Sequence, residues 1–364
     1  MTLYDRCRLS PIMVLSVLIS CRQSVSFLLN PTTKEVASSL RTSSLMLTEM
    51  DVLRRNQGFL MSPSKEERDY VKGLMMPISS THDDVLKTLK YKEYDSDKDS
   101  EGFGAVLLHD GVVRIDNVLS TQTTQNMLRY ANQLLKQSMD EIAFNDGIKF
   151  KLFGNVHMNK NRFDLLLPLE ESDEVMACLS ELLGDKSHVF HSLQAILGED
   201  AELFELSVLI SDPGSEAQPL HPDIIYQDTS PPILTCFVAL QDVSPQMGPT
   251  LFMPGSVSLK YHDDLHNRHL DPYATGLVAT SYNVLSTLSA GDCSIYDTMI
   301  LHLGSSNTSN RRRCLFYFSF KNNNVFKEGC RTGSSIRPSL KDRHLTLHDL
   351  RDKLGFYRDK TVKL

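Results

Sequence analysis

The chain has 364 residues, enough for one large domain with additions or for two domains. Its hydrophobic content of 41%, charged content of 23% and net charge of −7 fit an ordinary soluble globular protein and argue against nucleic acid as a partner. The seven cysteines form no CxxC pair and no apolar run is long enough to cross a bilayer, so we expect no disulfide framework, no cysteine zinc site and no stable membrane span. The oligomeric state stays open.

Residues 1–44 have the composition of a targeting presequence. Two arginines precede the short apolar stretch "PIMVLSVLIS", and Ser24 and Ser26 occupy the −3 and −1 positions of a cleavage site before Phe27. The Ser- and Thr-rich stretch that follows is typical of a transit peptide. This order resembles the bipartite plastid presequence of algae with complex plastids, so we expect entry into the secretory route and delivery to a plastid. The alternative is a capping helix on a cytoplasmic protein.

The next part of the chain is expected to be a helical extension, residues 45–101, that ends in a charged linker, "YDSDKDSEGFG". After the linker, "GAVLLHDGVVRIDNVLS" alternates between apolar and polar residues and predicts a strand. Ser120 is placed to cap a following helix, and a second helix is predicted near residues 172–183.

From about residue 203 the sequence predicts short strands separated by proline and glycine, which is typical of a sandwich or barrel. We therefore expect a mostly β domain with flanking helices over residues 102–325. Residues 326–364 form a C-terminal extension with a helix, in which Thr346 and Asp349 are spaced as a capping box. The predicted strands are "LFELSVLI", "HPDIIYQ", "PPILTCFVAL", "PTLFMPGS", "GDCSIYDTMILHLG" and "RRRCLFYFSFK".

One pair of residues, His221 and Asp223, has the spacing of two metal ligands on one strand face. The HxD pattern occurs four times in the chain, so it is weak evidence alone. Only this copy precedes an apolar, strand-like run. The copies at His262 and His269 lie in "YHDDLHNRHLDPYA", which we expect to be a solvated loop, and both histidines are expected to be dispensable.

A facial triad needs a third ligand from a distant part of the chain, and His302 is the best candidate. It ends the apolar run "YDTMILH", although an isolated histidine there would more often be a core residue. The following strand begins at Arg313 and places this arginine, Leu315 and Tyr317 on one face. A buried arginine beside a metal site is costly unless an anion pairs with it, and a bound dicarboxylate would be such an anion.

The order of five motifs over residues 102–325 resembles the phytanoyl-CoA dioxygenase-like family of iron(II)/2-oxoglutarate oxygenases. The motifs are "DGVVRIDNVLS", "DPGSEAQPLHPD", "FVALQDVSPQMGPTLFMPGS", "GDCSIYDTMILH" and "NTSNRRRCLFYFSF". The resemblance implies a double-stranded β-helix (jelly-roll) core and the cofactors Fe(II), 2-oxoglutarate and, as a further candidate, ascorbate. It implies that His221, Asp223 and His302 bind iron and that Arg313 binds 2-oxoglutarate, with Arg311 as the alternative register. Gln218 matches a family glutamine that lines the cosubstrate site, although a polar loop residue is an equal interpretation.

The chain departs from the family pattern at several places, which leaves the substrate open. Val257 stands where a histidine often follows the PGS turn, the usual acid-Asn-Gly turn is Met247-Gly248-Pro249, and tryptophan is absent. Family relatives that halogenate have alanine or glycine at the position of Asp223, so an intact carboxylate favours hydroxylation or desaturation. Arg162 is a candidate anchor for a substrate carboxylate or the cosubstrate; the alternative is a surface arginine before a strand.

The resulting hypothesis is a dioxygenase that hydroxylates or desaturates a small-to-medium organic substrate and releases succinate and CO2. Two alternatives remain at this stage: a non-catalytic jelly-roll module that binds a metabolite or partner, and a protein hydroxylase of the same fold.

Overall fold

The computed structural model describes residues 86–88, 100–154, 160–266, 277–278, 281–327 and 334–361. By its internal contacts the chain divides into two units, residues 1–67 and 68–364, and all described residues belong to the second. The predicted presequence and most of the predicted extension over residues 45–101 lie outside the described residues. The boundaries expected from the sequence therefore stay predictions.

Two β-sheets form the core of the described unit. All strand pairs of the six-stranded sheet are antiparallel, and its strand order is β2-β8-β5-β10-β4-β3. The four-stranded sheet has the order β1-β7-β6-β9, with one parallel pair, β1 and β7. The strands of the large sheet are β2 (Val112–Ile115), β3 (Arg162–Leu166), β4 (Glu202–Ser211), β5 (Ile233–Ala239), β8 (Cys293–Asp297) and β10 (Arg313–Lys321); those of the small sheet are β1 (Leu86–Thr88), β6 (Thr250–Phe252), β7 (Asn283–Leu285) and β9 (His302–Gly304).

The two sheets pack face to face around one apolar cluster. Phe237 and Leu315 of the large sheet and Phe252 and Val284 of the small sheet are buried in this cluster. Sheets that share an interior in this way make the jelly-roll core. The fold class expected from the sequence, a mostly β double-stranded β-helix with flanking helices, is confirmed.

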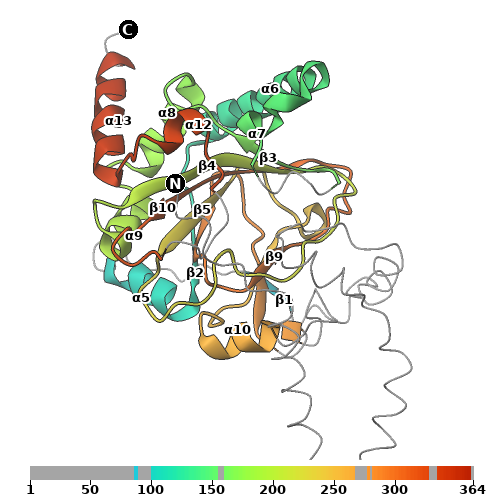
Figure 1. The fold of residues 1–364 in the computed structure, drawn as a ribbon, viewed down its shortest axis with the longest axis vertical. Coiled ribbons are helices and arrows are strands. Elements are labelled where there is room, and N and C mark those ends of the chain that lie inside the picture. The colour runs from blue at the N-terminus through green and yellow to red at the C-terminus, as the bar shows by residue number, and fades with distance from the viewer. Residues whose placement is uncertain are drawn as a thin grey trace, which may run out of the picture. The chain divides into compact units, whose positions relative to one another are not determined.

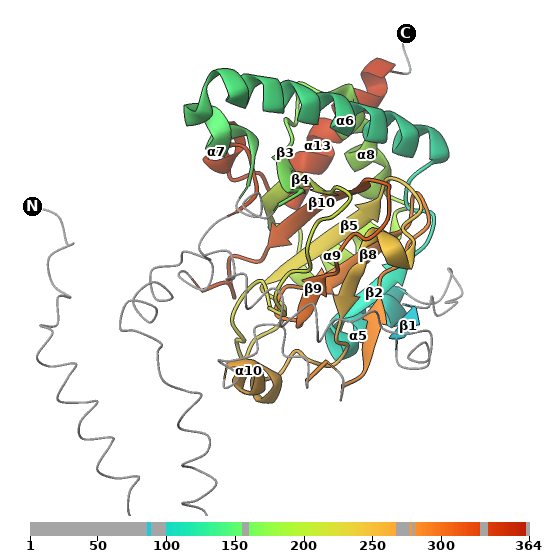
Figure 2. The ribbon, with the colours of Figure 1, turned by 90° about the vertical axis from the view of Figure 1, so that its right-hand side faces the viewer.

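Helices cover the outer face of the large sheet. Figures 1 and 2 show α6, α8, α12 and α13 together on one side of it, with α10 on the side of β9. Within the described residues, no helix combines the length and the apolar character that a bilayer crossing requires. The helices are α5 (Ser100–Asp110), α6 (Thr121–Phe144), α7 (Lys149–Leu152), α8 (Asp173–Leu182), α9 (His188–Leu197), α10 (Leu259–His266), α12 (Pro338–Lys341) and α13 (Leu347–Thr361), with 3-10 turns at Asp146–Ile148 and Pro245–Met247.

Strand β10 separates the interior of the barrel from the helical layer. Its residues Cys314, Phe316, Phe318 and Phe320 are buried in the cluster that packs against the helices. The alternate residues Leu315 and Tyr317 are buried in the cluster between the sheets. Successive side chains of a strand point to opposite faces, so Arg313 and Ser319 also face the interior. The predicted division of this strand into two faces is confirmed.

Both predicted helix caps are present. The hydroxyl of Ser120 accepts a hydrogen bond from the Thr123 N–H at the start of α6. At α13, the Thr346 N–H donates to Oδ2 of Asp349 (3.0 Å), and the Asp349 N–H donates to Oγ1 of Thr346 (3.1 Å). These reciprocal bonds satisfy donors that have no partner within the helix.

The N-terminal part of the core differs from the prediction. The stretch expected to begin a strand after residue 104 belongs to helix α5, and the strand β2 begins only at Val112. The Gly111 N–H donates to the Leu107 carbonyl (2.9 Å), and Gly111 has a φ of 79°, a left-handed conformation that ends the helix. Strand β1 lies in the range predicted to be helical and pairs with β7.

Three further predictions were wrong about local structure near His221 and His302. Residues 221–227 do not form a strand, because Pro222 has no N–H to donate and the segment makes only one isolated bridge, from His221 to His302. A turn interrupts "YDTMILH", so His302 begins β9 instead of ending β8. The predicted loop around His262 is the helix α10, and His262 is buried.

Burial makes the stability of this fold sensitive to pH. Burial raises the pKa of Asp297 from 3.8 to about 7, although its carboxylate accepts a hydrogen bond from the Met299 N–H. Burial likewise raises the pKa of Asp164 to about 6. The folded chain therefore keeps protons that the unfolded chain releases above pH 4. The contribution of these two carboxyl groups to stability is present in full below that pH and is lost as pH rises through their folded pKa values of about 6 and 7.

We expect Asp297→Asn to flatten this pH dependence, because the amide oxygen still accepts from Met299 while the buried charge is removed. The free energy of unfolding of the parent chain should fall by a few kcal/mol between pH 5 and pH 8, on the order of 1.4 kcal/mol per pKa unit. Chemical denaturation at both pH values measures it. Asp140→Asn, at an exposed position of α6, is the control. An equal fall in parent and Asp297→Asn chains would contradict the prediction.

Candidate functional site

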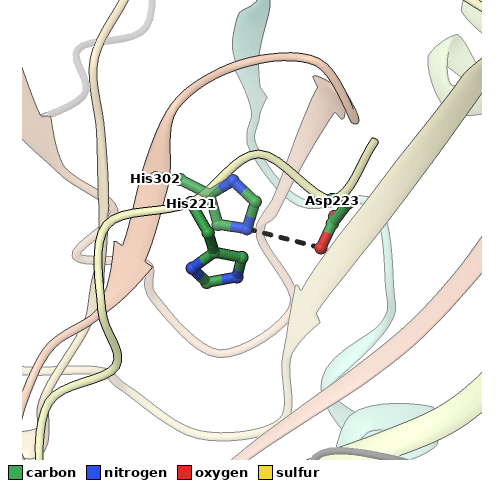
Figure 3. A group of neighbouring side chains, drawn as sticks. All are labelled: His221, Asp223 and His302. Carbon is green, nitrogen blue, oxygen red and sulfur yellow. Dashed lines mark ion pairs between the residues drawn. The ribbon is translucent and has the colours of Figure 1, made fainter. Parts of the chain in front are cut away.

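Three side chains with metal-binding atoms meet between the two sheets: His221, Asp223 and His302. One ligand atom from each lies within 4.8 Å of the others, and Figure 3 shows the two imidazole rings and the carboxylate grouped together. Nε2 of His302 is 3.8 Å from Oδ1 of Asp223. His302 is buried, whereas His221 and Asp223 are half-buried. Among the described residues, this is the one such group of histidine, cysteine or acidic side chains.

Backbone hydrogen bonds hold the three residues in register. The His221 N–H donates to the His302 carbonyl (3.0 Å), and the His302 N–H donates to the His221 carbonyl (2.9 Å). The two imidazole centroids are 4.6 Å apart as a result. The Asp223 N–H donates to the Thr298 carbonyl (2.9 Å), which ties the carboxylate to the turn before β9. The segment of His221 therefore acts as a further strand of the small sheet for one residue pair.

The hydrogen bonds of the two imidazoles define their tautomers. Nδ1 of His221 is 2.6 Å from the Pro219 carbonyl, and Nδ1 of His302 is 3.0 Å from the Ile300 carbonyl. A carbonyl oxygen can only accept, so Nδ1 carries the hydrogen in both rings. In the neutral ring with hydrogen on Nδ1, Nε2 presents a lone pair, which is the form in which a histidine binds a metal ion.

Tyr296 orients Asp223 and was not identified from the sequence. Its hydroxyl donates to Oδ2 of Asp223 (3.1 Å), which leaves Oδ1 toward His302. The ring lies on β8, is buried, and contacts His302 and Phe252 at centroid distances of 5.2 and 5.0 Å. Strand parity alone would place this tyrosine in the interior. The turn that brings Asp223 to its hydroxyl is not visible in the sequence.

Arg313 lies fully buried on the inner face of β10. It donates to the Gly248 carbonyl and to Oγ of Ser211 (3.0 Å), while its Nε has no partner among the described residues. Burial, followed by the nearby Arg162, lowers the pKa of Arg313 to about 9. Gly248 has a φ of 72°, and a Cβ there would collide with the backbone at Ser305. Glycine is therefore required at this departure from the family turn.

Arg162, the first residue of β3, is also fully buried, so its interpretation as a surface arginine was wrong. It donates to the carbonyls of Glu216 (2.9 Å) and Ser305 (3.2 Å), while Nε and Nη1 have no partner among the described residues. Burial lowers its pKa to about 10. A Cβ at Gly304 would lie 2.8 Å from Nη1. Because Gly304 follows His302 on β9, the arginine reaches the strand that carries this histidine.

Of the remaining predicted residues, Gln218 lies beside the buried arginines, whereas Arg311 does not. Oε1 of Gln218 accepts from the Gly304 N–H (3.1 Å), so Gln218 borders the space beside Arg162. Arg311 is exposed and precedes β10, and Arg312 binds Asp212. The structure thus places Arg313, and not Arg311, on the inner face. The HxD pairs at residues 82–84 and 269–271 lie outside the described residues.

The donor set suits one kind of metal centre. Two imidazole nitrogens and one carboxylate oxygen on one side of a site are the protein ligands of non-haem iron(II) oxygenases. The unpartnered N–H groups of two buried arginines suit a carboxylate, because a desolvated guanidinium without an anion is costly. The residues present therefore fit both iron(II) and an anionic cosubstrate.

Solved structures with a similar fold include iron- or 2-oxoglutarate-dependent enzymes. The epimerase SnoN from nogalamycin biosynthesis is 19% identical, with 61% of this chain and 83% of that chain covered and a TM-score of 0.46. The carbocyclase SnoK from the same biosynthesis is 17% identical, with coverages of 70% and 93% and a TM-score of 0.46. AviO1 from Streptomyces viridochromogenes Tue57 is 16% identical, with coverages of 65% and 99% and a TM-score of 0.43. Similarity at this level carries no part of the assignment.

The family assignment comes from the sequence of the core. Among curated proteins, none matches the chain. The family described as phytanoyl-CoA dioxygenase (PhyH) matches residues 107–314, which is more than half of the chain and extends from the end of α5 to the first residues of β10. This span contains the three candidate ligands and both buried arginines. The chain therefore belongs to the phytanoyl-CoA dioxygenase family of iron(II)- and 2-oxoglutarate-dependent oxygenases.

Proposed function

We propose that this protein is an iron(II)- and 2-oxoglutarate-dependent dioxygenase that hydroxylates or desaturates a small-to-medium organic substrate. One observation supports the proposal above all: a cluster of two histidines and one aspartate lies in the same barrel as two buried arginines that have no carboxylate partner among the described residues. A non-catalytic module would need neither the metal-binding cluster nor the pair of buried arginines. Family membership and the donor set support the general class.

In this proposal, Nε2 of His221, Nε2 of His302 and Oδ1 of Asp223 hold the iron. Bound iron and 2-oxoglutarate together supply the oxidative decarboxylation that releases succinate and CO2 and oxidises a substrate C–H bond. The protein's own residues hold the three ligand side chains in the orientation that metal binding requires. The Pro219 and Ile300 carbonyls keep both imidazoles in the ligating tautomer, and Tyr296 holds Asp223 so that one carboxylate oxygen faces the histidines.

Arg313 and Arg162 bind the anionic cosubstrate in this scheme. The carboxylate of 2-oxoglutarate would accept from the Nε of Arg313, and Arg162 adds a second positive charge from β3. A bound anion would counter both causes of the lowered pKa of Arg313, which are burial and, after it, repulsion from Arg162. Gln218 and Gly304 border this space and keep it narrow.

The reaction type follows from Asp223. Its carboxylate occupies the position that a halide would need, so we propose oxygen transfer or desaturation and not halogenation. No cluster of basic residues that would hold the phosphates of coenzyme A is evident in the sequence. This feature weighs mildly against a coenzyme A ester as the substrate.

Loss of either histidine should abolish metal binding. We expect His221→Ala and His302→Ala to hold no iron after anaerobic loading and to release no succinate, because two remaining ligands cannot fix the ion. Metal content per chain and succinate release are the two measurements. His348→Ala, exposed on α13, should keep one iron per chain. Full metal content in His221→Ala or His302→Ala would refute the assignment.

Loss of the buried arginine should weaken cosubstrate binding selectively. Arg313→Leu removes a buried charge-assisted pair worth about 2–4 kcal/mol, so the 2-oxoglutarate concentration for half-maximal turnover should rise by about 30- to 1,000-fold. Metal affinity should change little. Arg311→Leu is the matched control at an exposed position two residues earlier. If the control shows the large effect and Arg313→Leu does not, another group binds the cosubstrate.

Product analysis tests the reaction itself. Protein with iron(II), 2-oxoglutarate, 18O2 and chloride is incubated with extracts that supply metabolites, and products are followed by mass together with succinate. We expect substrate-dependent succinate and a product that gains one labelled oxygen or loses two hydrogens. A chlorinated product contradicts the reaction type. An iron-loaded protein without substrate-dependent succinate in any extract favours the binding module.

A further inference from the structure

His262 lies in an unexpected position. The sequence suggested a dispensable histidine in a solvated loop, but the side chain is only 9% exposed and lies on helix α10. Its ring packs against Tyr226, with the ring centroids 5.7 Å apart. Its ring and its hydrogen bonds contact Tyr226 and Met299, which are not candidate metal ligands. Burial without a role in the triad raises the question of what this imidazole does.

Both ring nitrogens of His262 form hydrogen bonds to the backbone. The Tyr226 N–H donates to Nδ1 (3.1 Å), and Nε2 is 2.8 Å from the Met299 carbonyl. An N–H can only donate and a carbonyl can only accept, so Nδ1 is the acceptor and Nε2 carries the hydrogen. The ring is therefore neutral, and burial, which lowers its pKa, favours that form. A protonated or flipped ring would lose at least one of the two bonds.

The two partners of His262 each lie three residues from a candidate metal ligand in the sequence. Tyr226 follows Asp223 by three residues, and Met299 precedes His302 by three residues. Neither segment belongs to a strand at these points, so few backbone bonds hold them. The N–H groups of Asp223 and Ile224 both donate to the Thr298 carbonyl, and the Gln227 N–H donates to Sδ of Met299 (3.3 Å). His262 adds a further connection between the two segments, through the Tyr226 N–H and the Met299 carbonyl.

We propose that His262 is a positioning residue whose imidazole holds the segment after Asp223 against the turn before His302, so that His221, Asp223 and His302 are spaced for one metal ion. This role presupposes the proposed metal site. His262 supplies no ligand. It replaces backbone pairing that Pro222 and the turn at residues 298–301 prevent. The expected consequence is that metal affinity depends on a residue of α10 that never touches the ion.

Metal affinity in the absence of turnover tests the proposal. Cobalt(II) is titrated into full-length protein, and the thermal unfolding temperature of the metal-free chain is measured in parallel. His262→Phe keeps an aromatic ring against Tyr226 but has neither hydrogen bond, so its affinity should fall about tenfold or more. His262→Gln offers one acceptor and one donor and should restore most of the affinity. His266→Ala, exposed on the same helix, is the control and should bind as the parent does.

Two results would overturn the proposal: parental cobalt affinity in His262→Phe, or a loss in His262→Gln as large as in His262→Phe. A purely structural role would lower the unfolding temperature of the metal-free chain in His262→Phe without the recovery of affinity in His262→Gln. Nitrogen chemical shifts of His262 in the metal-free protein give a second readout, since they must show hydrogen on Nε2. A parent chain that binds no cobalt would instead refute the proposed metal site.

Discussion

The reciprocal backbone bonds between His221 and His302 are the constraint on which the site depends. They join an irregular segment to β9 at a single residue pair, yet that pair brings together two imidazoles that are 81 residues apart in the chain. A strand pair fixes side-chain spacing without any contribution from the side chains themselves. The remaining elements of the site, the carbonyls at Nδ1, the Tyr296 hydroxyl and the His262 links, refine a geometry that the backbone has already set.

The interior of the barrel contains two buried guanidinium groups, Arg162 and Arg313, with N–H groups that have no partner among the described residues. Arg162 and Arg313 are fully buried, and their pKa values lie near 10 and 9 because burial disfavours the charged form. Burial of two guanidinium groups away from water lowers the free energy of unfolding unless an anion pairs with them. In the proposed function, binding of the cosubstrate carboxylate offsets this cost. The same barrel contains two buried acids with raised pKa values, Asp164 and Asp297. Burial of both acidic and basic groups therefore lowers the stability of the fold.

Much of the fold could be predicted from the sequence because it depends on local sequence patterns. The two faces of β10, the caps at Ser120 and Thr346, and the β-rich character beyond residue 203 each rest on periodicity or on residues a few positions apart. The HxD pair was predicted from a two-residue spacing that assumed a strand, which the structure does not show, and the distal histidine was predicted with the help of the order of family motifs. The predictions that were wrong concern stretches whose composition is compatible with two structures. "GAVLLHD" suits a strand and is a helix, and "YHDDLH" suits a loop and is also a helix.

The sequence by itself determined the class of protein, the candidate ligands and the inward face of Arg313, since these follow from residue types and spacing along one strand. Only the tertiary structure decided that Arg162 is buried beside Arg313, that Tyr296 donates to Asp223 and that His262 joins two ligand-bearing segments. Each of these depends on contacts between residues that are 36 to 151 positions apart. Such contacts are set by how sheets and turns pack in three dimensions, and nothing in a local pattern encodes which distant backbone a side chain will meet.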